Sequence, residues 1–476
     1  MVSLVVSKTF ALPAYLPDQS PASGALVRAQ NVYAAVDGYR PIGQFQSVSD
    51  ALAEPFQGGA SFISTDGSAF LLAGTASDLY RLDAGSWTSL IDSLSAGRWH
   101  FAQFGNYALG VNGSTSQVVD LAAGTGGEWT GAPTGTSITV VGDFVVIGGA
   151  DSDILMVKWS AFNDHTGWTP AVDQSGFQPM LTGGAVMGLG GGEYGVILQR
   201  QRIVRMDRTG DATAPFAFSE ITPNVGCASK GSIAQAGRSI FFLSDRGFMA
   251  LDDGQTLKPI GNEKVDRAFQ AAVSRDDYEL LYAAVDPRNT LVMWVMPGSP
   301  GTAWVYNWVL DRWTILEAPM SGVFSGFTSS LTLEALSAIY DDIDTMPYSL
   351  DDPRFSGGAP RLYFVDSGGR LGTFAGPALE ARISTGFIEV ADGRRARLRS
   401  VEPVADFDRG ATLEIDGRAR LKDAQNLKDT SVLRQSGIMP IRHSGQFMAF
   451  DFTISAGTDW SYFQSFKAEY EVGGER

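Results

Sequence analysis

The chain has 476 residues, with 36 Lys+Arg against 52 Asp+Glu and a formal net charge of −16. Its hydrophobic content of 44% excludes a disordered chain, because disorder requires low hydrophobicity and high charge. The acidic excess argues against a protein that grips DNA by neutralising phosphates, although an acidic wall would let DNA slide past without sticking.

Residues 1–57 are punctuated by Pro and Gly and predict an N-terminal arm. The short apolar run at 1–12 has no long hydrophobic region, so we expect no signal peptide. Apolar stretches elsewhere stay below the roughly 18 residues of a membrane-spanning helix. The single cysteine, Cys227, excludes an internal disulfide and a multi-cysteine zinc site.

Short apolar runs bounded by Gly, Asp and Asn dominate residues 58–380. Runs such as 140–147 and 290–295 are four to eight residues long, which favours strands over helices. A period of roughly 40–50 residues, with about four strands per unit, is typical of β-propeller blades, although a multi-sheet β-sandwich protein would look similar. We predict a propeller of six or seven blades. Its successive units are marked by Phe62, Phe101, Phe144, Tyr194, Ile240, Leu291 and Leu362.

The last gap in this repeat is the longest, which predicts an insertion around residues 318–358. The insertion contains a helical pattern at 331–340 and an acidic stretch at 341–352. A second helix is predicted over 262–269, with Asn262 as its N-cap.

The composition shifts near residue 380. Residues 381–476 carry 14 basic and 14 acidic side chains, so the whole charge of −16 belongs to residues 1–380. Apolar and polar residues alternate in segments such as 450–454, which is the pattern of half-buried strands. The sequence predicts a separate C-terminal domain at 381–476 that resembles a β-sandwich, next to an all-β propeller body at 58–380.

Side chains that could carry catalysis or bind metal are sparse. The three histidines, His100, His165 and His443, are far apart and none has a metal-ligand spacing. Neither a GxSxG elbow nor a phosphate-binding loop is present. Cys227 has no histidine nearby in sequence and is interpreted as a buried structural residue. We therefore expect no cofactor, no metal and no enzymatic activity.

Three other patterns are interpreted as structural. The carboxylate pairs at 276–277, 341–342 and 351–352 fall in turns with few aromatic residues beside them, unlike glycosidase pairs. The string at 158–170 contains two tryptophans and predicts a strand, an Asx-type turn and a tryptophan packed back on the sheet, rather than a ligand platform. The glycine run at 190–192 predicts a tight connection with a positive φ.

The one basic cluster consists of Arg394, Arg395, Arg397 and Arg399, in the neutral C-terminal segment. Strand alternation places Arg395, Arg397 and Arg399 on one face. This face is either simply solvated or a docking surface for an acidic partner, including another copy of this chain.

Several strings, spread in order over nearly the whole chain, resemble one protein family. They are Leu16–Asp18, Asn31–Tyr33, Asp37–Pro41, Trp159–Asp164, Gly192–Val196, Phe242–Phe248, Ala284–Asn289 and Tyr306–Trp313. The chain is similar to the tail-hub or nozzle proteins of short-tailed bacteriophages, also called packaged DNA stabilisation proteins.

This resemblance implies a propeller with a platform-like β-domain and a homohexameric ring below the portal and adaptor proteins. The ring would continue the DNA channel, retain packaged DNA until ejection and offer attachment sites for tail fibres, spikes or a needle. It implies a virion protein made in the bacterial cytoplasm, with no membrane insertion and no sequence-specific DNA binding. The alternatives are a propeller that binds glycans and a propeller glycosidase.

Overall fold

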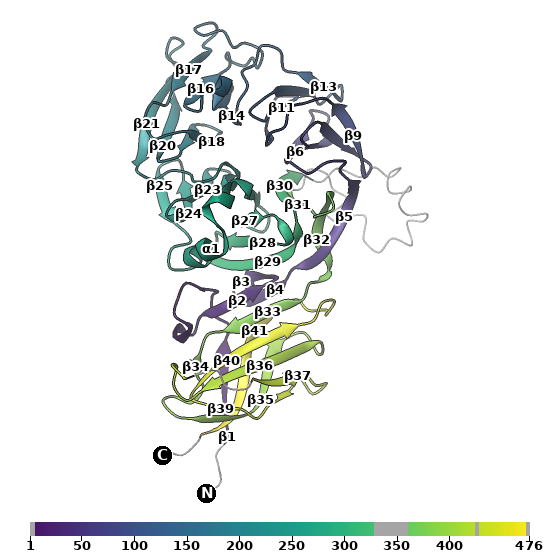
Figure 1. Ribbon diagram of the computed structural model, residues 1–476, viewed down its shortest axis with the longest axis vertical. Helices are drawn as coiled ribbons and strands as arrows, with labels where there is room; N and C mark the ends of the chain where they lie inside the picture. The colour runs from purple at the N-terminus through teal and green to yellow at the C-terminus, as the bar shows by residue number, and fades with distance from the viewer. Residues whose placement is uncertain (1–4, 328–359, 424–427, 473–476) are drawn as a thin grey trace.

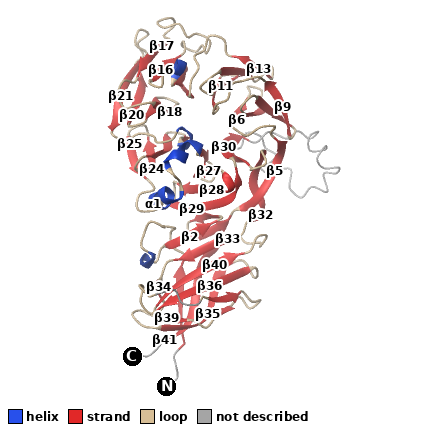
Figure 2. Cartoon of the chain, in the orientation of Figure 1, coloured by secondary structure: helices blue, strands red, loops and turns tan. Residues whose placement is uncertain are grey.

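The computed structural model describes residues 5–327, 360–423 and 428–472 (Figure 1). Strands dominate these residues, and the one α-helix among them is short (Figure 2). The strands form a ring at one end of the molecule and a pair of sheets at the other. The predicted all-β fold class is confirmed. Within the described residues, no helix is long and apolar enough to cross a membrane.

The ring is built from four-stranded antiparallel units that follow one another along the chain. The first four units are β6 (Gly58–Ile63), β7 (Ala69–Gly74), β8 (Leu79–Asp83) and β9 (Ser86–Ile91); β10 (His100–Phe104), β11 (Tyr107–Val111), β12 (Ser116–Asp120) and β13 (Thr125–Glu128); β14 (Ser137–Val141), β15 (Phe144–Gly148), β16 (Met156–Trp159) and β17 (Gly176–Pro179); and β18 (Val186–Gly190), β19 (Gly195–Gln199), β20 (Arg202–Arg208) and β21 (Phe216–Pro223). The others are β22 (Ala234–Ala236), β23 (Ser239–Ser244), β24 (Gly247–Asp252) and β25 (Thr256–Pro259); β26 (Tyr282–Asp286), β27 (Leu291–Met296), β28 (Gly298–Asn307) and β29 (Arg312–Met320); and β30 (Gly322–Phe327), β31 (Pro360–Val365) and β32 (Arg370–Ala378) with β5 (Gly43–Ala51).

Six of these units are separate four-stranded sheets, and the remaining unit, β26–β29, is part of a ten-stranded sheet that continues out of the ring. This group lies between two of the separate sheets, because β26 contacts both β22 and β30. The predicted propeller is therefore confirmed. Each of the seven apolar markers of the repeat falls in, or directly beside, a strand of a different unit.

The local sequence explains why the apolar runs form paired strands. In the run 140–147, β-branched residues suit the pleated surface of a sheet, and Gly142 adopts a φ of +56° at the turn between β14 and β15. The pairing Val141↔Phe144 then closes a two-residue hairpin. The buried faces of such hairpins face the next unit and form the cores between blades.

The N-terminal part of the chain closes the ring. Strand β5 pairs with β32 and becomes the outermost strand of the last unit, while β30 of that unit contacts β6 of the first. The last unit is therefore made from an early segment, at 43–51, and two late segments, at 322–327 and 360–378. Figure 1 shows β5 beside β31 and β32 at the edge of the ring.

The second part of the molecule contains two sheets. The seven-stranded sheet is formed by β1 (Val5–Ala11), β3 (Val32–Ala35), β4 (Gly38–Pro41), β35 (Ala396–Ala405), β38 (Met439–Pro440), β39 (Ser444–Gly445) and β41 (Phe463–Val472). The ten-stranded sheet adds β2 (Leu26–Gln30), β33 (Ala381–Thr385), β34 (Ile388–Glu389), β36 (Ala411–Arg418), β37 (Asp429–Val432) and β40 (Phe447–Ile454) to β26–β29. Their buried faces share one hydrophobic cluster, which we call the common core.

The N-terminal segment differs from its prediction. Residues 5–51 do not form an arm, because β1, β2 and β4 pair with strands of the C-terminal segment, β3 pairs with β4, and β5 joins the ring. The C-terminal segment 381–476 correspondingly shares both of its sheets with N-terminal strands. The Pro and Gly residues of the N-terminal segment mark turns between strands whose partners lie near the other end of the chain.

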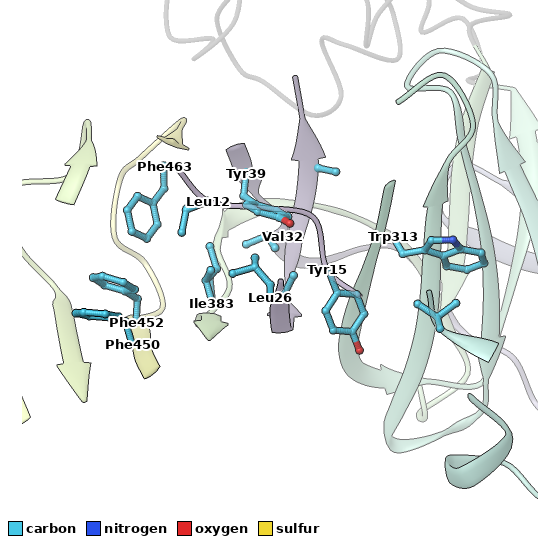
Figure 3. Close-up of a cluster of buried hydrophobic side chains, with 14 of the residues drawn as sticks. Leu12, Tyr15, Leu26, Val32, Tyr39, Trp313, Ile383, Phe450, Phe452 and Phe463 are labelled. Carbon is cyan, nitrogen blue, oxygen red and sulfur yellow. The ribbon is translucent and has the colours of Figure 1, made fainter. Parts of the chain in front are cut away.

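The common core extends from the two-sheet part into the propeller. Figure 3 shows Leu26, Ile383 and Phe452 of the two-sheet part in line with Tyr15 and with Trp313 of the propeller strand β29. All of these side chains are at most 5% exposed. Because the cluster has no break between the two parts, burial of apolar surface fixes them to each other.

Asn31 joins the two parts through its hydrogen bonds. Its backbone N–H donates to the carbonyl of Ile315 at 2.7 Å, and its side-chain oxygen accepts from the N–H of Glu317 at 2.8 Å. Its side-chain amide donates to the carbonyl of Glu380 at 2.8 Å. Asn31 has a φ of +60°, a conformation that asparagine tolerates better than most residues. One buried side chain thus connects β2, β29 and the start of β33.

The helix predicted over 262–269 begins later and uses another cap. The helix α1 spans Asp266–Ala272, because the N–H groups of residues 264–266 all donate to the carbonyl of Gly261 and form a turn. Its first N–H groups, at Arg267 and Ala268, donate to the carboxylate of Asp18 at 2.8 Å. The cap is therefore supplied from a distant segment, which local sequence reasoning at Asn262 could not detect.

Short 3₁₀ turns occur at η1 (Pro21–Ser23), η2 (Ala150–Ser152), η3 (Lys230–Ser232) and η4 (Arg275–Leu280). The predicted insertion does not begin at residue 318, since β29 runs to Met320 and β30 occupies residues 322–327. Its helical pattern at 331–340 and its acidic stretch at 341–352 lie outside the described residues.

Candidate functional site

The four arginines of the predicted docking face lie together at one end of β35, and all are exposed. Arg394 and Arg395 belong to the turn before the strand, where the N–H of Arg394 donates to the carbonyl of Ala391. On the strand, Arg397 and Arg399 alternate with buried residues, so their side chains lie on the outer face of the seven-stranded sheet.

The electrostatic surroundings of the four arginines are not uniform. Arg399 forms an ion pair with Glu471 on the neighbouring strand β41. Among the described residues, Arg394, Arg395 and Arg397 have no ion-pair partner within 4 Å, so their charges remain available to a partner molecule.

The structure adds one arginine to this cluster. Arg442 is exposed and directly follows Ile441, whose N–H donates to the carbonyl of Arg399 at 3.0 Å. Sequence analysis missed it because it lies far from the cluster along the chain, and only strand pairing brings it close. We call Arg394, Arg395, Arg397, Arg399 and Arg442 the arginine face.

A pocket of about 540 Å³ opens on the propeller face that carries the segments before β6, β10, β26 and β30. Its lining includes two carboxylates, Glu54 and Glu279, and two aromatic rings, Phe56 and Tyr282. The carboxylate of Glu54 accepts a hydrogen bond from the backbone N–H of Ser77 at 3.1 Å. Exposed Leu280 adds apolar surface to the rim.

Arg98 forms one wall of this pocket and links units that are not neighbours in the ring. Its guanidinium donates to the carbonyl of Glu279 at 2.9 Å and to the carbonyl of Leu281, and it stacks on the ring of Tyr282 at 3.8 Å. These groups lie just before or at the start of β26, whereas Arg98 lies just before β10. The sequence offered no signal for Arg98, because an isolated arginine before a strand is ordinarily solvated.

The histidines occupy three different environments. His100 lies beside Arg98, and burial, followed by the charges of Arg98 and Lys230, lowers its pKa to about 3. His165 packs against the ring of Tyr107 at 4.4 Å, and burial lowers its pKa as well. His443 is buried in the two-sheet part, with Nδ1 2.6 Å from a carboxylate oxygen of Asp429. The structure does not bring the three together, and no cluster of metal-ligating side chains occurs in the described ranges.

The string at 158–170 forms the predicted strand, turn and packed tryptophan. Asp164 accepts hydrogen bonds from the N–H of Thr166 at 2.8 Å and from its hydroxyl at 2.7 Å, which defines the Asx-type turn. The indole N–H of Trp168 donates to the carbonyl of His165 at 2.8 Å, and its ring meets Trp129 edge-on at 5.6 Å. Trp159, the other tryptophan of the string, is buried, and its ring meets Phe216 of the next blade edge-on at 5.3 Å. Both rings of the string therefore belong to the packing between neighbouring blades.

The glycine run 190–192 lies between β18 and β19 of one blade and touches the blades on both sides. Gly192 has a φ of +130°, and a side chain at Gly191 would meet the carbonyl oxygen of Val140 at 2.3 Å. The N–H of Gly191 donates to the side-chain oxygen of Gln235 at 3.0 Å. Because three units approach each other closely here, glycines are needed for steric reasons, and no phosphate ligand is required to account for them.

Cys227 and the carboxylate pair at 276–277 have the structural roles that the sequence predicts. Cys227 is fully buried and its thiol lies 3.0 Å from the carbonyl oxygen of Ser229. Burial raises the pKa of Cys227 to about 12, so the thiolate needed for catalysis is disfavoured. The carboxylates at 276–277 are exposed in the turn η4. The pairs at 341–342 and 351–352 lie outside the described residues.

Comparisons with solved structures give matches at low sequence identity, among them WD40 repeats. No protein-family model and no curated protein sequence matches the chain. The WD40 repeats of RRP9 align with 59% of this chain and 89% of their own, at 11% identity and a TM-score of 0.37. The extracellular domain of the putative one-component system BT4673 from B. thetaiotaomicron aligns with 79% of this chain and 45% of its own, at 10% identity and a TM-score of 0.42. BBS1N, in a complex with ARL6DN, aligns with 71% of this chain and 98% of its own, at 9% identity and a TM-score of 0.40.

Proposed function

We propose that this chain is a structural subunit of a short bacteriophage tail, without enzymatic activity. Six copies would form a ring below the portal and adaptor proteins, continue the DNA channel and help to retain packaged DNA. The same ring would carry tail fibres, spikes or a needle. The proposal rests on the resemblance of the strings between residues 16 and 313 to tail-hub proteins, and on two physical properties of the molecule.

The separation of charge along the chain is the observation that carries the proposal. Residues 1–380 hold the net charge of −16, whereas residues 381–476 are neutral and present the arginine face. An acidic body repels the phosphate backbone and suits a channel through which DNA must slide. Exposed arginines without ion-pair partners suit docking to an acidic surface, such as the propeller of the next copy.

The common core is the second property. A conduit that holds DNA under pressure needs subunits whose parts do not move relative to each other. The continuous burial from Phe452 to Trp313, together with the three hydrogen bonds of Asn31, fixes the propeller to the two-sheet part. In such a subunit, a neighbour that binds the arginine face of the two-sheet part also fixes the position of the propeller.

The proposal is tested by measuring the mass of the particles that the full chain forms. We expect a six-subunit ring at low salt, and loss of the ring in the double variant Arg395→Glu, Arg397→Glu. The matched control Arg409→Glu, Arg434→Glu changes the same charge at two other exposed arginines and should leave the ring intact. A chain that stays monomeric at tens of micromolar, with or without the adaptor protein, contradicts the proposal.

A glycan-binding propeller or a glycosidase is the second candidate, and the pocket beside Arg98 is the observation that favours it. Two carboxylates and two aromatic rings line that pocket, which is the composition that a sugar site requires. Electron microscopy of particles that contain the chain separates the candidates. A conduit subunit surrounds the DNA axis, whereas a receptor-binding propeller lies at the periphery.

A further inference from the structure

A hollow of about 460 Å³ lies on the outward face of the ten-stranded sheet, away from both the arginine face and the propeller pocket. Its lining residues come mainly from β2, β33, β36 and β40, which follow one another in the sheet in the order β2-β33-β40-β36. These strands can be followed in Figure 1. Along β36, Leu413 and Ile415 point into the common core, so the alternate residues face outward. Asp416 of β36 lies opposite Ala449 of β40. Because the side chain of Ala449 is small, the space above the sheet at this point stays open.

Acidic and basic side chains line the hollow in equal number. The acidic residues are Glu414, Asp416 and Asp451, and the basic residues are Arg28, Arg418 and Lys428. Two carboxylates, those of Glu414 and Asp451, occupy directly opposite positions on neighbouring strands, an arrangement that normally destabilises a sheet.

Hydrogen bonds hold these opposed carboxylates in place. Lys428 donates to Glu414 at 3.0 Å, and the hydroxyl of Ser384 donates to Asp451 at 2.7 Å. The bond to Glu414, and then the charges of Glu414, Asp451 and Asp416, raise the pKa of Lys428. One ammonium group therefore acts on all three carboxylates.

The floor of the hollow contains a donor and an acceptor with no partner. The guanidinium of Arg418 donates to one carboxylate oxygen of Asp416 at 3.0 Å and to the carbonyl of Leu421 at 3.3 Å. The second carboxylate oxygen of Asp416 and the Nε–H of Arg418 are buried and make no hydrogen bond within the described residues. The side chain of Asp416 is only 10% exposed. Leaving such buried groups unpaired is unfavourable, and a bound ligand or an ordered water would complete them.

We propose that this hollow binds one sugar unit of a carbohydrate, a neutral ligand that carries several hydroxyl groups. A hydroxyl both donates and accepts, so neighbouring hydroxyls satisfy the free oxygen of Asp416 and the free N–H of Arg418 together. An anion would meet three carboxylates and a cation would meet three basic groups, so the balanced lining favours a neutral ligand.

The size and surroundings of the hollow suit this ligand. Its volume lies within the range of small-molecule sites, about 300–1,000 Å³. Phe387 adds an aromatic wall, and the guanidinium of Arg418 is held above that ring at 4.4 Å. The proposal goes beyond the tail role and does not depend on it, because no residue of the arginine face lines the hollow.

Saturation-transfer NMR with the full chain tests the proposal. The probes are the methyl glycosides of glucose, galactose, mannose, rhamnose and N-acetylglucosamine, each at about 10 mM, which detects dissociation constants in the millimolar range. We expect at least one glycoside to receive saturation. Inorganic phosphate and acetate serve as anionic competitors, and neither should displace the glycoside.

Two variants locate the binding. Asp416→Ala removes the unpaired acceptor, and Ala449→Leu fills the hollow without changing a charge. Each substitution should weaken glycoside binding by about tenfold or more, which corresponds to the loss of about 1.4 kcal/mol of binding free energy. The control Arg409→Ala removes an exposed arginine that does not line the hollow and should bind as the parent chain does.

Thermal unfolding shows whether Ala449→Leu is folded like the parent chain. Glu414→Gln is a second, isosteric variant, and it should weaken glycoside binding by the same factor. The proposal is overturned if none of the five glycosides binds, if the filled variant binds as well as the parent, or if phosphate competes. Failure of ring formation leaves this outcome unaffected, so the two proposals fail separately.

Discussion

Asp266 is a buried carboxyl group at the start of α1, and its ionisation should set part of the pH dependence of stability. Burial raises its pKa from 3.8 to about 6; a hydrogen bond from the N–H of Phe248 opposes this shift, and the charge of Asp18 adds to it. Because the folded pKa lies above the unfolded one, folding takes up a proton between these values. The stability from the protonated carboxyl is therefore full below about pH 4 and is lost as the pH rises through about 6.

The substitution Asp266→Asn removes this dependence and preserves the local contacts. The amide oxygen can still accept from the N–H of Phe248, a bond of 3.0 Å. The shift of about two pKa units corresponds to about 3 kcal/mol, which solvent screening reduces to about 1–2 kcal/mol. We expect the variant to be more stable than the parent chain by that amount at about pH 8, with the difference shrinking toward zero as the pH falls to about 4.

Urea unfolding monitored by tryptophan fluorescence, from about pH 4 to pH 8, measures this difference. Asp276→Asn is the matched control, because Asp276 is exposed in η4 and lies outside the core. The reasoning is refuted if Asp266→Asn is stabilised equally at both ends of the range, or if the control shows the same pH-dependent gain.

Two further variants test the joint and the pocket. Asn31→Ala loses the hydrogen bonds to Glu317 and Glu380, which should cost about 1–3 kcal/mol, while urea unfolding remains a single transition because of the common core. Asn31→Gly tolerates the φ of +60° and should lose a similar amount of stability. A glycine variant as stable as the parent chain, or urea unfolding in two transitions, would contradict this account. Arg98→Met should raise the pKa of His100 in an NMR titration, because it removes a nearby positive charge, and an unchanged pKa would show that burial alone sets it.

Local sequence predicted the features that depend on neighbouring residues. Apolar runs such as 140–147 became hairpins because β-branched residues and a turn glycine act within a few positions. The alternation of Arg397 and Arg399 with buried residues also followed from the period of a strand. The Asx-type turn at Asp164 depends on a side chain and a backbone two residues apart, so it too was predictable.

The missed features all depend on contacts between distant segments. The N-terminal strands have partners in the C-terminal segment, and nothing in residues 5–51 specifies that pairing. The cap of α1 comes from Asp18, and Arg442 joins the arginine face through strand register alone. The hollow around Asp416 likewise exists only because Ala449 of another strand lies opposite.

The closure of the ring and of the two-sheet part by early strands has a consequence for biosynthesis. Strands β1, β2, β4 and β5 leave the ribosome early, yet their partners β32, β33 and β41 are translated only after the rest of the propeller. During this interval their unpaired edges and apolar faces remain available to other chains, which is a recognised route to aggregation. Chaperones that bind extended apolar segments are therefore expected to meet this protein during translation.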